Sequence, residues 1–292
     1  MSRAQERQSV RKTYKLYIGG AFPRSESGRS YEVTAADGRF LANAARASRK
    51  DLRDAVVAAR KAQPGWAAAT AYNRGQVLYR VAEIIEGRRE QFAAEVAAAR
   101  GVDDTAASAE VDAAIDRWVW YAGWSDKVAI VDGAANPVAG PYFNFSIPEP
   151  TGVVGIVAPQ TSPLLGLVSV IAPVVVSGNT CVVIASERAP LPAITLGEVL
   201  ATSDVPGGVI NLLTGSVEEL AGHLAGHMDV NAIDLTGVEP EAAAELEVAA
   251  AENVKRVLRA PADGEPDWTA DPDPRRMLRF TETKTVWHPM GV

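Results

Sequence analysis

The fold is decided by residues 150–184, which read PTGVVGIVAPQTSPLLGLVSVIAPVVVSGNTCVVI. Two short apolar runs in this stretch enclose a segment of helical character, and the pattern repeats further along the chain. The apolar runs lie at 153–157, 180–184, 209–213 and 232–235, and the helical segments near 163–176, 190–202 and 216–226. Short apolar runs that alternate with helices are typical of a parallel sheet covered on both faces. The sequence therefore predicts an α/β fold with a Rossmann-like, doubly wound parallel sheet.

The N-terminal part is predicted to hold one short strand and three helical stretches. The strand lies at 14–20. The helical stretches are 48–63, ended by Pro64-Gly65, then 71–100, as one long helix or two in succession, ended by Gly101, and 105–127. The last of these carries Trp118, Trp120, Tyr121 and Trp124. Aromatic residues at this density fill a core or a subunit contact more often than they bind a ligand.

The C-terminal part continues the same alternation and then changes character. A helix is predicted at 239–253 and a strand at 254–258, followed by a Pro-rich segment typical of a linker. Strands with alternating side chains are predicted at 142–147 and 280–287.

The composition is that of a folded globular protein, with 292 residues, 47% hydrophobic and 22% charged. The formal net charge of −7 opposes binding to nucleic acid or to anionic membranes. The basic start, MSRAQERQSVRKTYK, lacks the apolar centre of a signal peptide, and no window is apolar enough to span a bilayer. We therefore expect a cytoplasmic protein without nucleic-acid or membrane partners.

The residues that could hold a metal or a disulfide are few. Cys181 is the single cysteine, and it lies in a predicted buried strand, where a thiol usually behaves as a small inert hydrophobe. His223 and His227 are four residues apart, but no HExxH pattern or cysteine cluster accompanies them. We expect solvated helix histidines and no metal site.

Four segments resemble the cofactor-binding half of the aldehyde dehydrogenase family in order and spacing. They are PTGVVGIVAPQTSPLL, SGNTCVVIASERAPL, PGGVINLLTGS and LTGV. The ending, RFTETKTVWHPMGV, resembles the extreme C-terminus of that family. The resemblance implies that the catalytic domain with its nucleophilic cysteine, which would lie between them, is missing. It also implies how the chain is divided. Residues 151–258 form the cofactor-type domain, and residues 1–127 pack on it. Residues 128–150 and 279–292 form a small antiparallel bridging and oligomerisation sheet, and residues 259–278 form the linker.

The catalytic positions implied by the resemblance carry other residues. The oxyanion asparagine of a Pro-Trp-Asn-Phe-Pro motif corresponds to Thr161, and the glutamate base corresponds to Arg259 or Ala260. Loss of one oxyanion donor lowers the rate by about 10²–10³ where it has been tested. We therefore predict no catalytic residue, Cys181 included.

The cofactor positions are degenerate in the same way. The family's Lys-Pro-Ser-Glu motif corresponds to 184–187, so that Ser186 and Glu187 remain without the lysine. The Gly-Ser-Thr-x-x-Gly turn retains Gly237 but continues with Glu239 and Glu241, which would repel a phosphate. Glu187, Ser186 and Gly237 are the candidate cofactor-binding residues. We expect no bound cofactor, with NAD as the alternative.

In this family the bridging sheet docks on the catalytic domain of a partner subunit, and the helix matching 239–253 lies near the dimer contact. The resemblance, with the chemistry lost and these surfaces kept, predicts a catalytically inactive subunit that assembles with a full-length aldehyde dehydrogenase and stabilises or regulates it. Alternatives are NAD-dependent aldehyde oxidation completed by residues of a partner subunit, and a ligand-free homo-oligomeric scaffold. The strand at 280–287 could also simply complete the chain's own sheet.

Overall fold

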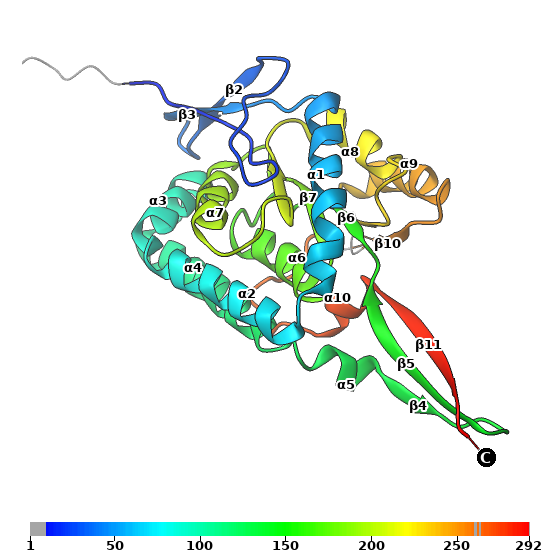
Figure 1. The fold of residues 1–292 in the computed structure, drawn as a ribbon. Coiled ribbons are helices and arrows are strands. Elements are labelled where there is room, and N and C mark those ends of the chain that lie inside the picture. Colours follow the sequence, from blue (N-terminus) through cyan, green and yellow to red (C-terminus); the bar gives the residue numbers. More distant parts are fainter. Residues whose placement is uncertain (1–9, 260–261, 263, 292) are drawn as a thin grey trace, which may run out of the picture.

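The computed structural model describes residues 10–259, 262 and 264–291, and its elements are arranged around one parallel sheet (Figure 1). The helices are α1 Arg49–Ala68, α2 Ala71–Glu86, α3 Arg89–Arg100, α4 Asp104–Ala122, α5 Val128–Asp132, α6 Leu165–Val176, α7 Leu191–Thr202, α8 Val217–Ala225, α9 Pro240–Ala251 and α10 Arg275–Leu278. The strands are β1 Thr13–Tyr14, β2 Ser30–Thr34, β3 Phe40–Ala45, β4 Ala134–Asn136, β5 Tyr142–Pro150, β6 Val153–Val157, β7 Thr180–Ile184, β8 Ile210–Leu213, β9 Ala232–Asp234, β10 Arg256–Leu258 and β11 Thr281–Pro289.

The central sheet has the strand order β10-β9-β6-β7-β8, with every pair parallel. Alternate side chains of its strands point to opposite faces. Val154 and Ile156 pack with α2, α4, α6 and α7, whereas Val153 and Val157 pack with α1, α8 and α9. Helices therefore cover both faces, and the doubly wound α/β fold predicted from the sequence is confirmed.

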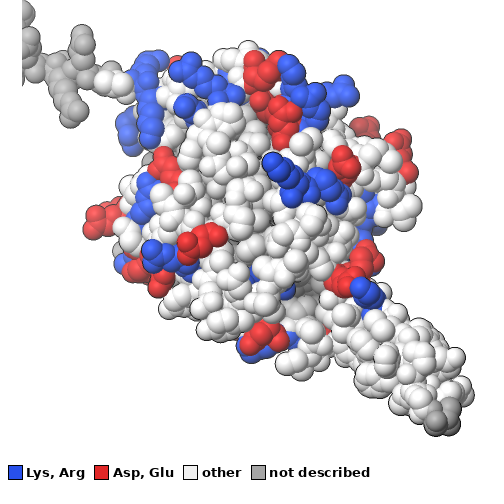
Figure 2. Space-filling view, in the orientation of Figure 1, with Lys and Arg blue, Asp and Glu red and all other residues white. Residues whose placement is uncertain are grey.

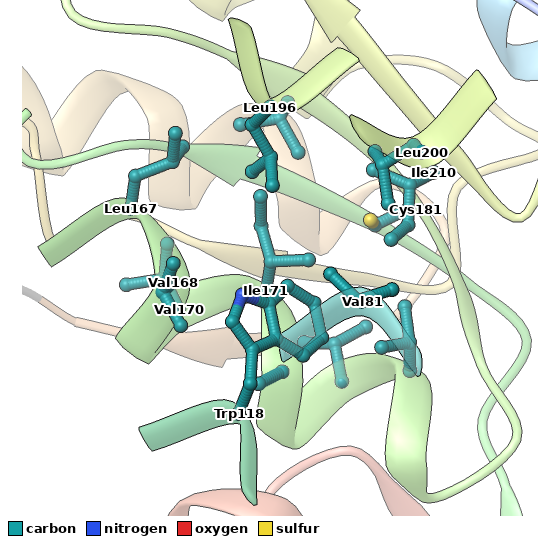
Figure 3. Packing of buried hydrophobic residues seen from close by; sticks show 14 of the residues in the cluster. Val81, Trp118, Leu167, Val168, Val170, Ile171, Cys181, Leu196, Leu200 and Ile210 are labelled. Atoms are coloured by element: carbon teal, nitrogen blue, oxygen red, sulfur yellow. The ribbon is translucent and has the colours of Figure 1, made fainter. Parts of the chain in front are cut away.

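The larger core cluster explains the dense aromatic residues of α4. Trp118 and Tyr121 are buried, and Trp118 packs beside Ile171 of α6 (Figure 3). Trp120 and Trp124 are half-buried against the same cluster, with ring centroids 5.3 Å apart. The prediction that these residues serve packing is confirmed for the two that are fully buried.

Helix α1 is longer than predicted, because it continues through Pro64 to Ala68. A proline inside a helix removes one hydrogen bond and costs about 3 kcal/mol. Tertiary contacts of the last turn offset that cost: Trp66 is buried, and its Nε1 donates to the carbonyl of Val175 at 2.8 Å. The predicted stop at Pro64-Gly65 is therefore wrong. The predicted start is confirmed, with Ser48 and Asp51 forming a capping box.

Two smaller sheets flank the central one. Of the predicted strand at 14–20, only Tyr14 belongs to a strand, which is β1. Strand β1 joins β2 and β3 in the order β1-β3-β2. The predicted strands at 142–147 and 280–287 lengthen to β5 and β11, which pair antiparallel from Thr281↔Pro150 to Pro289↔Tyr142. With β4 they form an arm that projects away from the body (Figure 1). The small antiparallel sheet is thus present as predicted.

The Pro-rich segment packs on the body more closely than its composition predicts. Met277 of α10 is fully buried, and the guanidinium of Arg117 donates to the carbonyls of Trp268 at 2.8 Å and Ala270 at 3.0 Å.

The predicted helix at 105–127 ends at Ala122, and a separate short helix, α5, follows. No helix among the described residues is long and apolar enough to cross a bilayer.

Glu95 of α3 is a partly buried carboxyl whose ionisation should affect stability. Its Oε1 accepts hydrogen bonds from Thr195 at 2.7 Å and Gln91 at 3.1 Å. Burial raises the pKa of Glu95 from 4.5 to about 7. Between those two values the folded state keeps a proton that the unfolded state releases, so stability falls as the pH rises through this window.

We predict that Glu95→Gln leaves stability unchanged near pH 4 and raises it at pH 8. The expected gain in the free energy of unfolding at pH 8 is roughly 2 kcal/mol. It is smaller than the whole pKa shift would give, because the carboxyl is partly exposed to solvent. Denaturant unfolding at both pH values measures it. Glu90→Gln, at an exposed position of the same helix, is the matched control. An equal effect of Glu95→Gln at both pH values would contradict the prediction.

Candidate functional site

A pocket of about 470 Å³ lies beyond the carboxyl ends of β6, β7 and β9, between α8 and α9. Ligands of doubly wound folds bind at this edge of the sheet. Two of the three residues predicted from the sequence, Glu187 and Gly237, line the pocket, and Ser186 precedes Glu187 in the chain. The structure therefore brings the candidate cofactor residues together.

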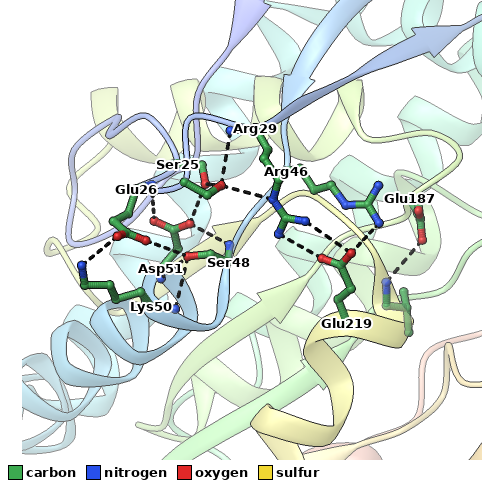
Figure 4. A network of polar contacts seen from close by, with 11 residues as sticks. Ser25, Glu26, Arg29, Arg46, Ser48, Lys50, Asp51, Glu187 and Glu219 are labelled. Atoms are coloured by element: carbon green, nitrogen blue, oxygen red, sulfur yellow. Dashed lines mark hydrogen bonds and ion pairs between the residues drawn. The ribbon is translucent and has the colours of Figure 1, made fainter.

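Glu187 acts as a cap for α8. Its Oε2 accepts a hydrogen bond from the main-chain N–H of Val217, the first residue of that helix, at 3.3 Å (Figure 4). The side chain of Ser216, which occupies the usual capping position, makes no such bond. A carboxylate at a helix N-terminus is favourable because it satisfies a free N–H and complements the helix dipole. Glu187 therefore has a structural partner of its own.

Ser186 and Glu187 also tie the loop after β7 to the loop after β6 through one residue, Gln160. The hydroxyl of Ser186 donates to the carbonyl of Gln160 at 3.0 Å, and the N–H of Glu187 donates to its Oε1 at 3.0 Å. The Nε2 of Gln160 donates to the carbonyl of Ala158 at 2.7 Å. The sequence analysis did not single out Gln160, because no local pattern shows that the two loops meet there.

Gly237 is required by a close approach of the backbone. A Cβ at this position would lie 1.9 Å from the carbonyl oxygen of Ala158, whereas the Gly237 N–H donates to the carbonyl of Val157 at 3.0 Å. Any larger residue would separate the β6 and β9 loops. The glycine is therefore explained by packing, without a phosphate.

The pocket does not fit the diphosphate of NAD. Its rim carries Glu187, Glu218, Glu239 and Glu245 against one cation, Arg188. Helix α9 begins with Pro240, which has no N–H to offer an anion, and Glu241 lies in its first turn. Ile184, at the place of the family's lysine, is buried in β7. The volume could hold a nucleoside, but the middle of a dinucleotide would meet acidic side chains instead of free N–H groups.

Cys181 and the positions aligned with the family's catalytic residues do not come together in the structure. Cys181 is fully buried in β7, and burial raises the pKa of its thiol, which agrees with the prediction of an inert side chain. Arg259 forms an ion pair with Glu247 at 2.6 Å. Ala260, the other position aligned with the base, lies outside the described residues. The hydroxyl of Thr161 donates to the carboxylate of Glu265.

A buried ion pair at the end of β9 was missed by the sequence analysis. Asp234 is fully buried, and its Oδ1 accepts the N–H of Thr236 at 3.0 Å while its Oδ2 pairs with Arg276. Arg276 also donates to the hydroxyl of Thr236 at 2.9 Å and lies 5.5 Å from the ring centre of Trp268. The sequence did contain a signal for this pair, because Asp234 is a charged residue in an apolar run and a buried carboxylate needs a partner.

The histidines and acids do not form a metal centre in the described part of the chain. No group of three or more His, Cys, Asp or Glu side chains that could hold a metal ion occurs there. His223 is exposed on α8, and His227 lies beyond the end of that helix, where its Nδ1 accepts the N–H of Asp229 at 3.2 Å.

Comparison with known proteins places this geometry in a family. Residues 22–260 match the model of the aldehyde dehydrogenase family. The chain is 32% identical to mouse cytosolic 10-formyltetrahydrofolate dehydrogenase, over 88% of this chain and 29% of that protein. It is 33% identical to cytosolic aldehyde dehydrogenase 1 of Elephantulus edwardii, over 83% of this chain and 49% of that protein.

Solved structures agree with the sequence comparison. The NAD⁺ complex of an aldehyde dehydrogenase from Bacillus cereus superposes with a TM-score of 0.80 and 28% identity, covering 84% of this chain and 50% of that one. The chain thus spans half or less of the length of the relatives it matches. On this match of sequence and fold, the chain belongs to the aldehyde dehydrogenase family.

Proposed function

We propose that this chain is a catalytically inactive subunit of a cytoplasmic assembly, in which it docks on a full-length aldehyde dehydrogenase and stabilises or regulates that enzyme. The observation that carries the proposal is a strand edge on the projecting arm that has no partner strand among the described residues. The chain holds Thr161, and Arg259 or Ala260, at the positions aligned with the family's catalytic residues. A long exposed edge invites pairing with another chain.

The hydrogen-bond pattern of the arm determines which groups of β11 face outward. Hydrogen-bonded pairs of an antiparallel ladder alternate with pairs that share no hydrogen bond. Thr151 donates to the carbonyl of Phe280 at 3.1 Å and Met290 to that of Pro141 at 2.8 Å, which sets the phase. Pro148, Pro150 and Pro289 then all occupy pairs without hydrogen bonds. The residues whose N–H and C=O groups face away from β5 are Thr281, Thr283, Thr285 and Trp287.

The far end of the arm is uncharged and aromatic. Residues 134–147 and 285–291 contain no Lys, Arg, Asp or Glu, and Figure 2 shows the corresponding bare surface. Tyr142 and Trp287 stack edge to face with centroids 5.8 Å apart, yet 42% and 59% of their surfaces stay exposed. Phe143, which points to the opposite face of the arm, is 49% exposed. Aromatic residues are enriched at the centres of protein interfaces and charged ones are depleted.

A second strand edge that is unpaired in the described part of the chain lies close to the first. Strand β10 is the last strand of the central sheet, and α9, which precedes it, exposes 71% of Val248. Arg256 of β10 forms an ion pair with Glu282 of β11 at 2.6 Å, so the two edges adjoin. Together they form one surface, which we call the docking edge, consisting of α9, β10 and β11.

A full-length relative is the partner best suited to this surface. The chain spans 49–50% of the two aldehyde dehydrogenases compared above, so a second chain could supply the other half. Glu282 and Lys284 are engaged within the chain, with Arg256 and Glu149, which leaves mainly backbone and apolar groups for the partner.

We predict that Thr283→Pro weakens assembly, because it removes an outward N–H without touching the pairing with β5. The side chain of Thr283 is exposed, and proline is tolerated on edge strands. Affinity should fall roughly tenfold or more, and Thr283→Val is the matched control. Mass measurement of the complex recovered from the native host through a tag on this chain, with wild type and both variants, provides the readout.

Recovery of the wild-type chain with no aldehyde dehydrogenase would refute the proposed partner. Recovery of two or more copies of this chain alone would identify the homo-oligomeric scaffold instead. Equal recovery of the partner with wild type and with Thr283→Pro would show that the β11 edge is not part of the interface, although the proposed partner would stand.

For the cofactor, we predict that millimolar NAD⁺ leaves the melting temperature of this chain unchanged. A ligand at 100 times its Kd would add about 2.7 kcal/mol. A full-length aldehyde dehydrogenase measured in parallel serves as the positive control. A saturable rise in melting temperature that Glu187→Ala abolishes would contradict the prediction and restore NAD as a ligand of the pocket.

A further inference from the structure

The carboxylate of Glu265 occupies the loop that follows β6. Its Oε1 receives the main-chain N–H of Gln160 and that of Thr161, the latter at 3.1 Å, and its Oε2 receives the hydroxyl of Thr161. Two consecutive residues thus direct three donors at one carboxylate. Hydrogen bonds to a charged acceptor are among the stronger ones in proteins.

These donors are held in place by contacts that do not involve Glu265. The carbonyl and side chain of Gln160 are fixed by Ser186 and Glu187 from the next loop. On the other side, the hydroxyl of Ser162 accepts the N–H of Gly166 at 2.8 Å, which joins the loop to the start of α6. The two N–H groups are therefore oriented by the loop itself, as in a preformed binding site.

The segment that carries Glu265 is anchored at several points further along. Arg117 holds the carbonyls of Trp268 and Ala270, and Arg276 binds Asp234 at the end of β9. Met277 is buried in the main core. These anchors keep the carboxylate near the loop at high effective concentration.

We propose that the loop after β6 is a carboxylate-binding site and that its resident ligand is the chain's own Glu265. The segment 264–278 then closes the carboxyl edge of the sheet without any bound cofactor. Thr161, which stands at the place of the oxyanion donor, has its hydroxyl engaged by this contact. The inference concerns the chain alone and is independent of the partner proposed above.

The test is chemical rescue of a variant that lacks the internal carboxylate. Glu265→Ala should lower the melting temperature by several degrees, and sodium acetate should restore it along a saturating curve. Sodium chloride at the same ionic strength should not. Wild type should not respond to acetate, and Glu245→Ala, at an exposed glutamate without a bonded partner in the described chain, should match wild type.

Equal melting temperatures of Glu265→Ala and wild type, or equal stabilisation of both by acetate, would overturn the proposal. If Glu265→Ala does not fold, amide hydrogen exchange of wild type and Glu265→Gln decides the question. The Gln160 and Thr161 amides should exchange at least tenfold more slowly in wild type than in Glu265→Gln. Equal rates in the two proteins would reject the site.

Discussion

The whole structure depends on burying a parallel sheet on both faces. All residues of β6 and β7 are buried, so each strand needs apolar cover from two sides. The crossover helices α6 and α7 cover one face, and α8 and α9 cover part of the other. The long helix α1, which comes from far earlier in the chain, completes it with Leu52, Val56 and Ala59. Gly155 of β6 lets Leu224 of α8 approach, since a Cβ there would lie 2.8 Å from its Cγ.

Once both faces are covered, the remaining problem is the carboxyl edge, where strands end and polar groups emerge. A buried carboxylate or N–H without a partner costs free energy, so the edge has to be satisfied by a ligand, by water or by the chain. Here the chain does so itself. Arg276 neutralises Asp234, Gln160 joins the first two loops, and Glu265 engages the loop amides. The same contacts give the Pro-rich segment a fixed path, which its composition alone would not predict.

The sequence predicted the elements that depend on local rules and missed the contacts that depend on distant partners. Ser48 and Gly101 mark a helix start and a helix end through capping, which is local. Pro64 was misleading because Trp66 finds its acceptor on Val175, more than a hundred residues away. The candidate residues Glu187 and Gly237 lie at the carboxyl edge of the sheet. Their roles as a helix cap and as a close-packing glycine depend on α8 and on the β6 loop.

Glu265 shows the limit of sequence reasoning most clearly. One glutamate in a Pro-rich segment carries no pattern, and its partners, Gln160 and Thr161, lie about a hundred residues earlier. No periodicity or motif connects such positions. The contact becomes visible only when Arg117 and Met277 fix the path of the segment.

The distribution of satisfied groups indicates where this protein should meet other molecules. At the carboxyl edge of the central sheet, the polar groups of the loops already have internal partners. On the arm the reverse holds, because the outward groups of β11 have no partner strand among the described residues and Trp287 remains mostly exposed. Unsatisfied backbone and exposed aromatic surface favour association, whereas a closed edge does not. We therefore expect association at the arm rather than at the pocket between α8 and α9.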